Sequence, residues 1–195
     1  MGGKKKGKYS THQKIFSKYA YKQEGVAYIG WQTTVEQSLE IGRVVPFAYI
    51  SSYKEAADEL VDKAVDSGLE DLYVFPIMFL YRQYLELILK NMYFKFSEDS
   101  IQKKGDFVKK YGHKLSPYWK KCEQLLCQSK ISSDDIDKIG SLINDFERID
   151  EYSFVFRYYL HKNSNIILPK DLFIDLKKLK EAVDKVDDLL YGTYD

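Results

Sequence analysis

The chain has 195 residues and a mass of 22.9 kDa, a length that favours one domain with at most an appended arm. Apolar residues make up 45% of the chain and charged residues 30%, so a core can form and a largely disordered chain is excluded. The net charge of +1 excludes nucleic-acid binding through overall positive charge and leaves room only for a local basic patch.

Residues 1–50 are expected to form a basic tail followed by an irregular extension. The first eight residues are rich in lysine and no apolar segment follows them, which does not fit a secretory signal peptide. Residues 26–29 fit a short strand and residues 33–40 fit a helix. Neither element is expected to extend far, because the region is interrupted by Gly25, Gly30, Gly42 and Pro46.

Residues 51–195 are predicted to form a single helical bundle domain. Its first helix is expected to be capped by Ser51 or Ser52 and to end at Gly68. The apolar segment at residues 72–96 predicts the longest helix of the domain, because apolar side chains occur around nearly all of its circumference.

The second half of the chain predicts further helices separated by short connections. Residues 97–112 contain two glycines and several lysines, so we expect a connection with about one helical turn there. Pro117 fits the first turn of one helix, and Ser132 begins a capping signature for the next. Residues 150–159 are ambiguous, and a last helix is expected to begin near Pro169. Together these elements predict an all-α, antiparallel helical bundle with four or five main helices.

The central apolar segment is interrupted by Arg82, Glu86 and Lys90, which makes it too charged for a membrane span of about 20 residues. In a helix these three side chains share one narrow sector, together with several aromatic residues. Two interpretations remain open. The sector is either a solvent-facing stripe with an ordinary Arg82–Glu86 pair, or a polar cleft in which partly desolvated charges need one another.

Two histidines are candidates for proton transfer. His113 precedes a predicted helix and fits either packing at the helix start or chemistry. His161 follows Arg157 by four positions, so the two would share one face of a helix. An arginine that stabilises phosphate charge beside a histidine that moves a proton is a sensible ribonuclease arrangement, whereas an exposed pair at a helix end is the alternative. Asp150 could orient Arg157 or be solvated.

Several other kinds of site are not indicated. The chain has no glycine-rich phosphate loop and no serine nucleophile elbow, and its histidines and cysteines are poorly spaced for zinc. We therefore expect no metal and no cofactor. Cys122 and Cys127 are expected to be reduced, as in a cytoplasmic protein. A basic face for nucleic acid, or a solvated surface, is indicated by Lys103, Lys104, Lys109, Lys110, Lys114, Lys120 and Lys121.

Three segments together resemble a pattern found in HEPN-like helical proteins of bacteria and their mobile elements. The first is residues 79–90, FLYRQYLELILK. The second is residues 112–115, GHKL, with Trp119 behind it, and the third is residues 150–158, DEYSFVFRY. With the helices between them, these segments cover roughly residues 70–160.

The resemblance implies an α-helical bundle, often a homodimer, that binds or cleaves RNA in toxin–antitoxin or anti-phage systems. A nucleotidyltransferase antitoxin is one partner it implies. In active members an Arg and a His on one helix carry metal-independent RNA cleavage, and the pairs of two protomers meet at the dimer interface. Arg157 and His161 would take these roles here, with fewer residues between them than is usual in the family.

We therefore expect a cytoplasmic HEPN-like RNA-binding protein or metal-independent endoribonuclease. Arg157 would contact phosphate, and His161 or His113 would be the acid or base. A substrate-binding or structural polar cluster would be formed by Arg82, Glu86, Lys90 and Asp150. The alternative is a non-catalytic helical interaction module, such as an antitoxin, immunity or adaptor protein, which would need an exposed apolar patch of several hundred Å².

Overall fold

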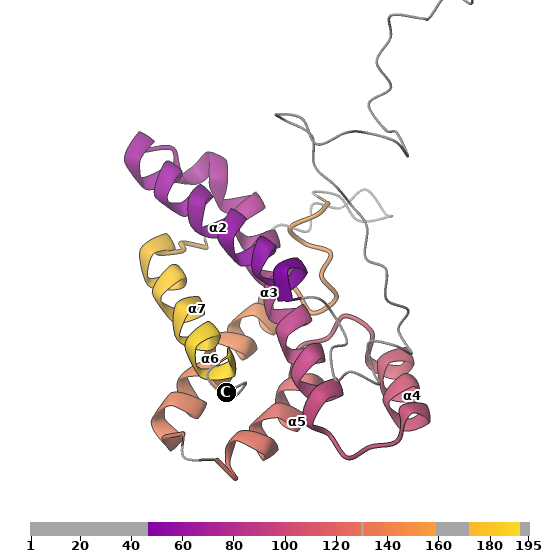
Figure 1. The fold of residues 1–195 in the computed structure, drawn as a ribbon. Helices are drawn as coiled ribbons and strands as arrows, with labels where there is room; N and C mark the ends of the chain where they lie inside the picture. The colour runs from indigo at the N-terminus through magenta and orange to yellow at the C-terminus, as the bar shows by residue number, and fades with distance from the viewer. Residues whose placement is uncertain (1–46, 130, 159–171, 192–195) are drawn as a thin grey trace, which may run out of the picture. The chain divides into compact units, whose positions relative to one another are not determined.

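The computed structural model describes residues 47–129, 131–158 and 172–191, and these residues belong to one compact unit. Over these ranges the structure is all-helical and contains no strand, which confirms the predicted fold class. The helices, shown in Figure 1, are α2 (Phe47–Ser67), α3 (Glu70–Phe96), α4 (Ile101–Tyr111), α5 (Ser116–Leu126), α6 (Ser133–Ile149) and α7 (Leu176–Tyr191). The strand and helix expected within residues 26–40 lie outside the described residues.

Helices α2 and α3 form a tight antiparallel hairpin. Helix α2 begins at Phe47, before the expected caps Ser51 and Ser52. Both serines lie inside the helix, and the Ser52 hydroxyl donates to the carbonyl of Tyr49 in the preceding turn. Gly68 ends the helix as predicted, with a φ of 66° that side chains disfavour. The small residues Ala57 and Ala64 are fully buried, so α2 can lie close to α3.

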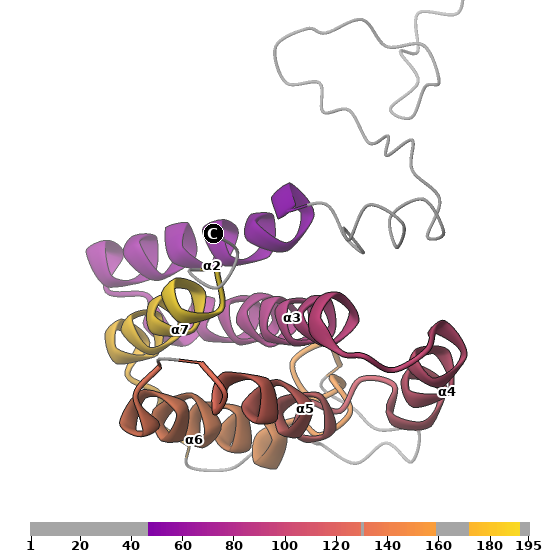
Figure 2. The ribbon, with the colours of Figure 1, turned by 60° about the horizontal axis from the view of Figure 1, so that its bottom comes forward.

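Helix α3 is the centre of the bundle and packs against α2, α5 and α7. Figure 2 shows α3 and α7 side by side, with α2 on one side of them and α5 and α6 on the other. By length and composition alone α3 could cross a membrane, with a mean hydropathy of 1.3 over its most apolar window, but half of that window is buried inside the bundle. The core helix of a soluble protein has the same properties.

Helix α4 occupies most of the segment where we expected a connection, so that prediction was wrong. The Ser100 hydroxyl caps the helix, and Gly112 ends it with a φ of 54°. Its apolar side, Phe107 and Tyr111, packs against the aromatic residues of α3 and α5. Gly105 and the lysines favoured a loop, but Gly105 is tolerated inside a helix that is stabilised by packing.

Helices α5 and α6 begin as the sequence predicts. Pro117 lies in the first turn of α5, and the Ser132 hydroxyl caps α6 by accepting the Asp135 N–H at 3.1 Å. The two helices approach closely where Gly140 faces Trp119, because a Cβ atom at Gly140 would lie 3.1 Å from the indole nitrogen. One buried stripe of α6 consists of Ile136, Ile139, Ile143 and Phe146.

Helix α7 begins at Leu176, later than the expected start near Pro169, which lies outside the described residues. Residues 172–175 are not helical, so Leu172 is exposed instead of belonging to the apolar stripe. The start is set by Asp175, whose carboxylate accepts the Lys178 N–H at 3.0 Å as an N-cap does. The buried stripe that holds α7 in the bundle consists of Leu176, Leu179, Val183, Val186 and Leu190.

Candidate functional site

A polar cluster lies inside the bundle against one side of α3. We call it the Arg82 cluster and define it as Arg82, Glu86, Lys90, His113 and Asp150. The first three residues come from consecutive turns of α3. His113 lies in the turn between α4 and α5, and Asp150 follows the last residue of α6. Three segments that are far apart in the sequence therefore meet in one cluster.

The side chain of Arg82 is completely buried and uses its guanidinium group in three directions. Its Nε donates to the main-chain oxygen of Asp150 at 3.3 Å, its Nη1 to Glu86 Oε2 at 3.3 Å, and its Nη2 to the main-chain oxygen of His113 at 2.5 Å. Burial lowers the pKa of Arg82 from its ordinary value, while the charge of Glu86 acts in the opposite direction. The solvent-stripe interpretation is therefore wrong, and the charges are desolvated.

Glu86 is the centre of the cluster, with a side chain that is only 3% exposed. Besides Arg82, its carboxylate accepts from Lys90 Nζ at 2.7 Å and contacts His113 Nδ1 at 2.9 Å. A buried carboxylate is costly unless it is paired and hydrogen-bonded, and these contacts supply the compensation. Burial, and after it the charge of Glu86, raises the pKa of Tyr118 in α5 to about 12.

His113 is where the cluster reaches solvent, since its side chain is 59% exposed. Because an ionised carboxylate only accepts hydrogen bonds, Nδ1 is assigned as the donor to Glu86, and in the neutral form of the ring Nε2 can then accept a proton. The main-chain oxygen of the same residue is held by Arg82. The ring is thus positioned from two sides, and the pair can pass a proton between Nε2 and a bound molecule.

Asp150 has a structural role in this arrangement. Its carboxylate accepts the N–H groups of Phe154 at 2.5 Å and Val155 at 3.0 Å, so it is directed at the main chain of the following turn and not at Arg157. This turn also contains Ser153, which has a left-handed φ of 55° and a buried hydroxyl without a hydrogen-bond partner. Such backbone strain persists only where the surrounding structure fixes it.

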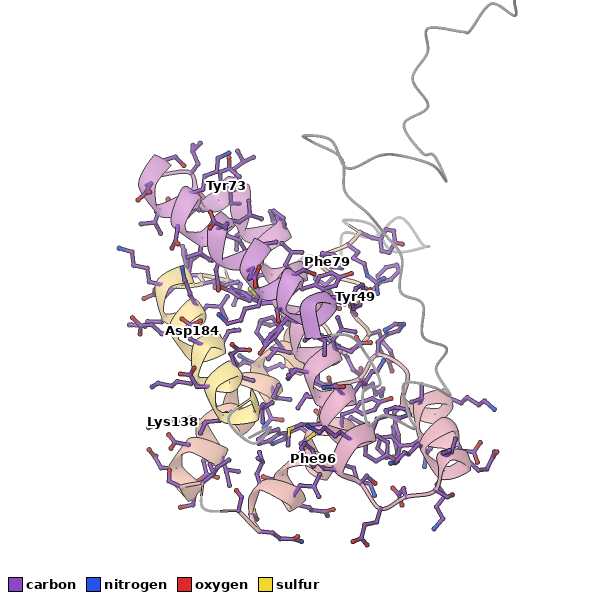
Figure 3. The ribbon with its side chains drawn as sticks, in the orientation of Figure 1. Tyr49, Tyr73, Phe79, Phe96, Lys138 and Asp184 are labelled. Atoms are coloured by element: carbon purple, nitrogen blue, oxygen red, sulfur yellow. The ribbon has the colours of Figure 1, made fainter. Side chains whose placement is uncertain are left out.

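Arg157 lies in the same turn and is exposed. Its Nε donates to the Ser153 carbonyl at 2.5 Å, and its guanidinium lies 6.0 Å from the ring centroid of Phe79, a residue labelled in Figure 3. The segment left ambiguous in the sequence is not helical at Arg157, since residues 151–157 form turns and a bend, so a shared helix face for Arg157 and His161 is not supported there. His161 lies outside the described residues.

The candidate basic face is only partly available. Lys104 is buried and donates to the Phe94 carbonyl at 2.9 Å, and Lys121 pairs with Asp99 at 3.3 Å. Lys114 pairs with Glu151 at 2.5 Å. The lysines of the predicted face that remain exposed are Lys103, Lys109, Lys110 and Lys120. A continuous seven-lysine surface is therefore not formed.

A second polar cluster, which the sequence analysis did not identify, joins α3 to α2 and α7. We call it the tyrosine–aspartate cluster. Tyr81 donates to Asp58 at 2.6 Å and Tyr84 donates to Asp187 at 2.5 Å. The cluster is completed by Lys54, which pairs with Asp58 and with Asp184, a residue of α7 that is labelled in Figure 3. The only signal in the sequence was tyrosine at apolar positions of the central helix.

Other features of the described residues offer less chemistry. No group of three or more His, Cys, Asp or Glu in this part of the chain is arranged to hold a metal ion. Cys122 and Cys127 do not form a disulfide, and burial raises the pKa of Cys122 to about 12, so its thiol is unreactive. Two open grooves, between α2 and α7 and between α6 and α7, include no residue of the Arg82 cluster.

Comparison of the chain with protein-family models, curated proteins and solved structures finds no match.

Proposed function

We propose that this chain is a cytoplasmic HEPN-like protein that binds RNA and cleaves it without a metal ion, in bacterial defence or toxin–antitoxin control. One observation supports the proposal above all: the exposed imidazole of His113 has its inner nitrogen on a buried carboxylate, Glu86. A homodimer, as in the proteins the sequence resembles, is part of the proposal.

In the proposed reaction, RNA supplies its own nucleophile, the ribose 2′-hydroxyl. His113 Nε2 accepts the 2′-hydroxyl proton, and the 2′-oxygen forms a bond to the adjacent phosphorus. The bond from phosphorus to the 5′-oxygen breaks, and that oxygen takes a proton from water. The products are a 2′,3′-cyclic phosphate and a 5′-hydroxyl end. Glu86 stabilises the imidazolium that forms, because its charge lies 2.9 Å from Nδ1.

The other charged residues divide into contact and positioning roles. Arg157 is exposed and can donate two parallel hydrogen bonds to a phosphate, a geometry that lysine lacks. Arg82 and Asp150 are buried and are positioning residues, since they hold His113 and the turn without reaching solvent. Lys90 is partly exposed and balances the charge of Glu86.

The test is cleavage of an end-labelled RNA of mixed sequence in the presence of a chelator. We expect products that end in a 2′,3′-cyclic phosphate, and we expect His113→Gln to lower the rate by about 10²- to 10⁴-fold. Arg157→Gln should weaken the reaction, whereas Arg148→Gln, at an exposed arginine of α6, is the matched control and should not. RNA left intact by the wild-type chain, or cut equally by His113→Gln, would contradict the proposal.

A second candidate function is a non-catalytic interaction module such as an antitoxin, immunity or adaptor protein. It is favoured by an exposed apolar group at the start of α3, formed by Leu69, Leu72 and Phe75, which recur every three residues on one side of the helix. In this case Leu72→Asp would abolish binding of a protein partner, such as a nucleotidyltransferase, while His113→Gln would have no effect in a cellular assay.

A further inference from the structure

Glu147 lies in the last turn of α6, and its carboxylate reaches the turn that carries His113. Its Oε2 accepts the main-chain N–H of Leu115 at 2.7 Å. Leu115 occupies the cap position of α5, and its apolar side chain makes no capping hydrogen bond. The glutamate of a capping box makes the same contact, but from within the helix that it caps. Here the cap comes from a different helix and ties the start of α5 to the end of α6.

The position of the His113 ring depends on this tie as well as on α3. Two contacts of His113 come from α3, because Arg82 donates to its main-chain oxygen at 2.5 Å and Glu86 holds Nδ1 at 2.9 Å. Glu147 adds a contact from α6, two residues further along the same turn. Figure 2 shows α5 and α6 side by side, and α5 also packs against α3. The imidazole is therefore placed by two helices that are distant in the sequence.

The same end of α6 also holds the turn that carries Arg157. Asp150 directly follows the helix, and its carboxylate accepts the main-chain N–H groups of Phe154 and Val155. Two carboxylates that are three residues apart, those of Glu147 and Asp150, therefore hold two different turns. One turn carries the imidazole of the proposed reaction and the other carries its phosphate ligand.

A cap that served only the stability of α5 would not need to come from α6. A serine or an aspartate at position 115 would supply a capping acceptor locally, and such residues are the usual choice at that position of a helix. The contact from Glu147 does more than a local cap can do, because it fixes the turn before α5 relative to the turn after α6.

We propose that Glu147 is a positioning residue for His113, which sets the place of the imidazole relative to Arg157. This inference rests on the proposed function and adds a residue to its machinery. Glu147 does not touch the RNA and acts through the main chain of Leu115. A reacting group that is displaced by about 1 Å can lose about 10²-fold in rate. Loss of the contact should therefore lower kcat and leave KM unchanged, because phosphate binding by Arg157 is retained.

The first experiment measures kcat and KM for cleavage of an end-labelled RNA by the full chain. Glu147→Leu should lower kcat about 10- to 100-fold, with KM within about twofold of the wild type. Glu147→Gln keeps an acceptor oxygen at the same reach and should retain at least about half of the wild-type kcat. The matched control is Asp145→Leu, on the same helix, whose carboxylate pairs with the exposed Arg148 at 3.1 Å. This control should leave kcat unchanged.

The second experiment does not depend on cleavage. Nitrogen NMR of the histidine-labelled chain, at a pH where the ring is neutral, reports which imidazole nitrogen carries the proton, and His113→Gln identifies the signal. The wild type should show the proton on Nδ1, which faces Glu86. Glu147→Leu should show a mixture of both tautomers, and Glu147→Gln should resemble the wild type. A cap that only stabilised α5 would leave the tautomer unchanged in a folded variant.

Circular dichroism should show that each variant keeps the helical content of the wild type, since the loss of one cap is small against the stability of a domain. Glu147→Asp keeps the charge but is one methylene shorter. It should also lower kcat, and it replaces Glu147→Leu if that variant does not fold.

The outcomes separate this inference from the proposed function. If cleavage depends on His113 but Glu147→Leu keeps the wild-type kcat and tautomer, the positioning role is refuted and the proposed function stands. A Glu147→Gln variant as impaired as Glu147→Leu also refutes it, because the acceptor oxygen would then not be what matters. If the wild-type chain leaves RNA intact, the proposed function fails, while the tautomer measurement still supports or overturns the positioning of the ring.

Discussion

Helix α3 brings polar groups into the core on two opposite sides, and the two clusters are built differently. At about 100° per residue, Arg82 and Glu86 lie on one side of the helix and Tyr81 and Tyr84 on the other. The Arg82 cluster holds full charges that are nearly completely buried and binds the main chain of two distant turns. The tyrosine–aspartate cluster combines neutral hydroxyl donors with Lys54 and with carboxylates that are only partly buried.

The two clusters show that a buried polar group can serve the stability of the fold without serving a reaction. Both clusters join helices that are distant in the sequence, so a polar group in the core is not by itself an indication of function. The two clusters differ in the group that each presents to solvent. The Arg82 cluster ends at the exposed imidazole of His113, whereas no exposed imidazole ends the tyrosine–aspartate cluster among the described residues. The following predictions test this difference.

The largest effect on stability is expected from Arg82→Met. The substitution leaves the Glu86 carboxylate buried with less compensation and leaves two main-chain oxygens without their donor. The free energy of unfolding should fall by about 3–5 kcal/mol, measured by urea denaturation with circular dichroism. Adding Glu86→Leu to this variant should recover part of the loss, because the carboxylate that lost its arginine partner is then removed from the core. A single variant as stable as the wild type would show that the ion pair does not hold the core.

A smaller loss is expected in the other cluster from Tyr84→Phe. The change removes a hydrogen bond to a charged acceptor, Asp187, and should cost about 1.5–3 kcal/mol in the same assay. Tyr81→Phe should cost less, because its acceptor Asp58 keeps the ion pair with Lys54 at 2.8 Å. The reverse order of the two losses would contradict this account.

The pH dependence of stability should also differ between the clusters. Burial raises the pKa of Asp187 above its ordinary value of 3.8, so the folded state binds this proton more tightly than the unfolded state. The resulting stabilisation is present at low pH and is lost as the pH rises through the folded pKa. Asp187→Asn should therefore make the unfolding free energy fall less steeply over that range, whereas Asp188→Asn, at an exposed neighbour, should not. An Asp187→Asn variant whose unfolding free energy depends on pH as the wild type's does would contradict this assignment.

The smallest effect on stability is expected from His113→Gln. The side chain is 59% exposed and Glu86 keeps Arg82 and Lys90 as partners, so unfolding should change by no more than about 0.5 kcal/mol. RNA cleavage should nevertheless fall sharply. A loss of stability as large as that of Arg82→Met would mean that the imidazole belongs to the structural part of the cluster, and its proposed role would be wrong.

The sequence predicted the helices that have strong local signals and missed those decided by packing. Ser132 and Pro117 marked helix starts correctly, because capping and proline geometry are local properties. Helix α4 was missed because its stability comes from aromatic contacts with α3 and α5. Asp175, and not Pro169, marks the start of α7, since a side chain that can accept a main-chain N–H is the stronger cap.

The candidate site was predicted only in part, because most of its contacts depend on packing between segments that are distant in the sequence. The spacing of Arg82 and Glu86 indicated an ion pair, but not its burial, because α3 is apolar on most of its surface. Two of the three acceptors of Arg82 are main-chain oxygens. Every residue has such an oxygen, so residue types in the sequence cannot predict these two contacts. The contact of His113 with Glu86 depends on the turn after α4, a helix that the sequence did not reveal.

The three-way guanidinium contact has a consequence for how this protein can diverge. A lysine at position 82 could not reach Asp150, Glu86 and His113 in the same fixed geometry, so the fold itself demands arginine there. The imidazole of His113 is under no such constraint from the fold, because it is 59% exposed. If the proposed function holds, position 113 should therefore vary with RNA cleavage among related chains, whereas position 82 should stay arginine in all of them.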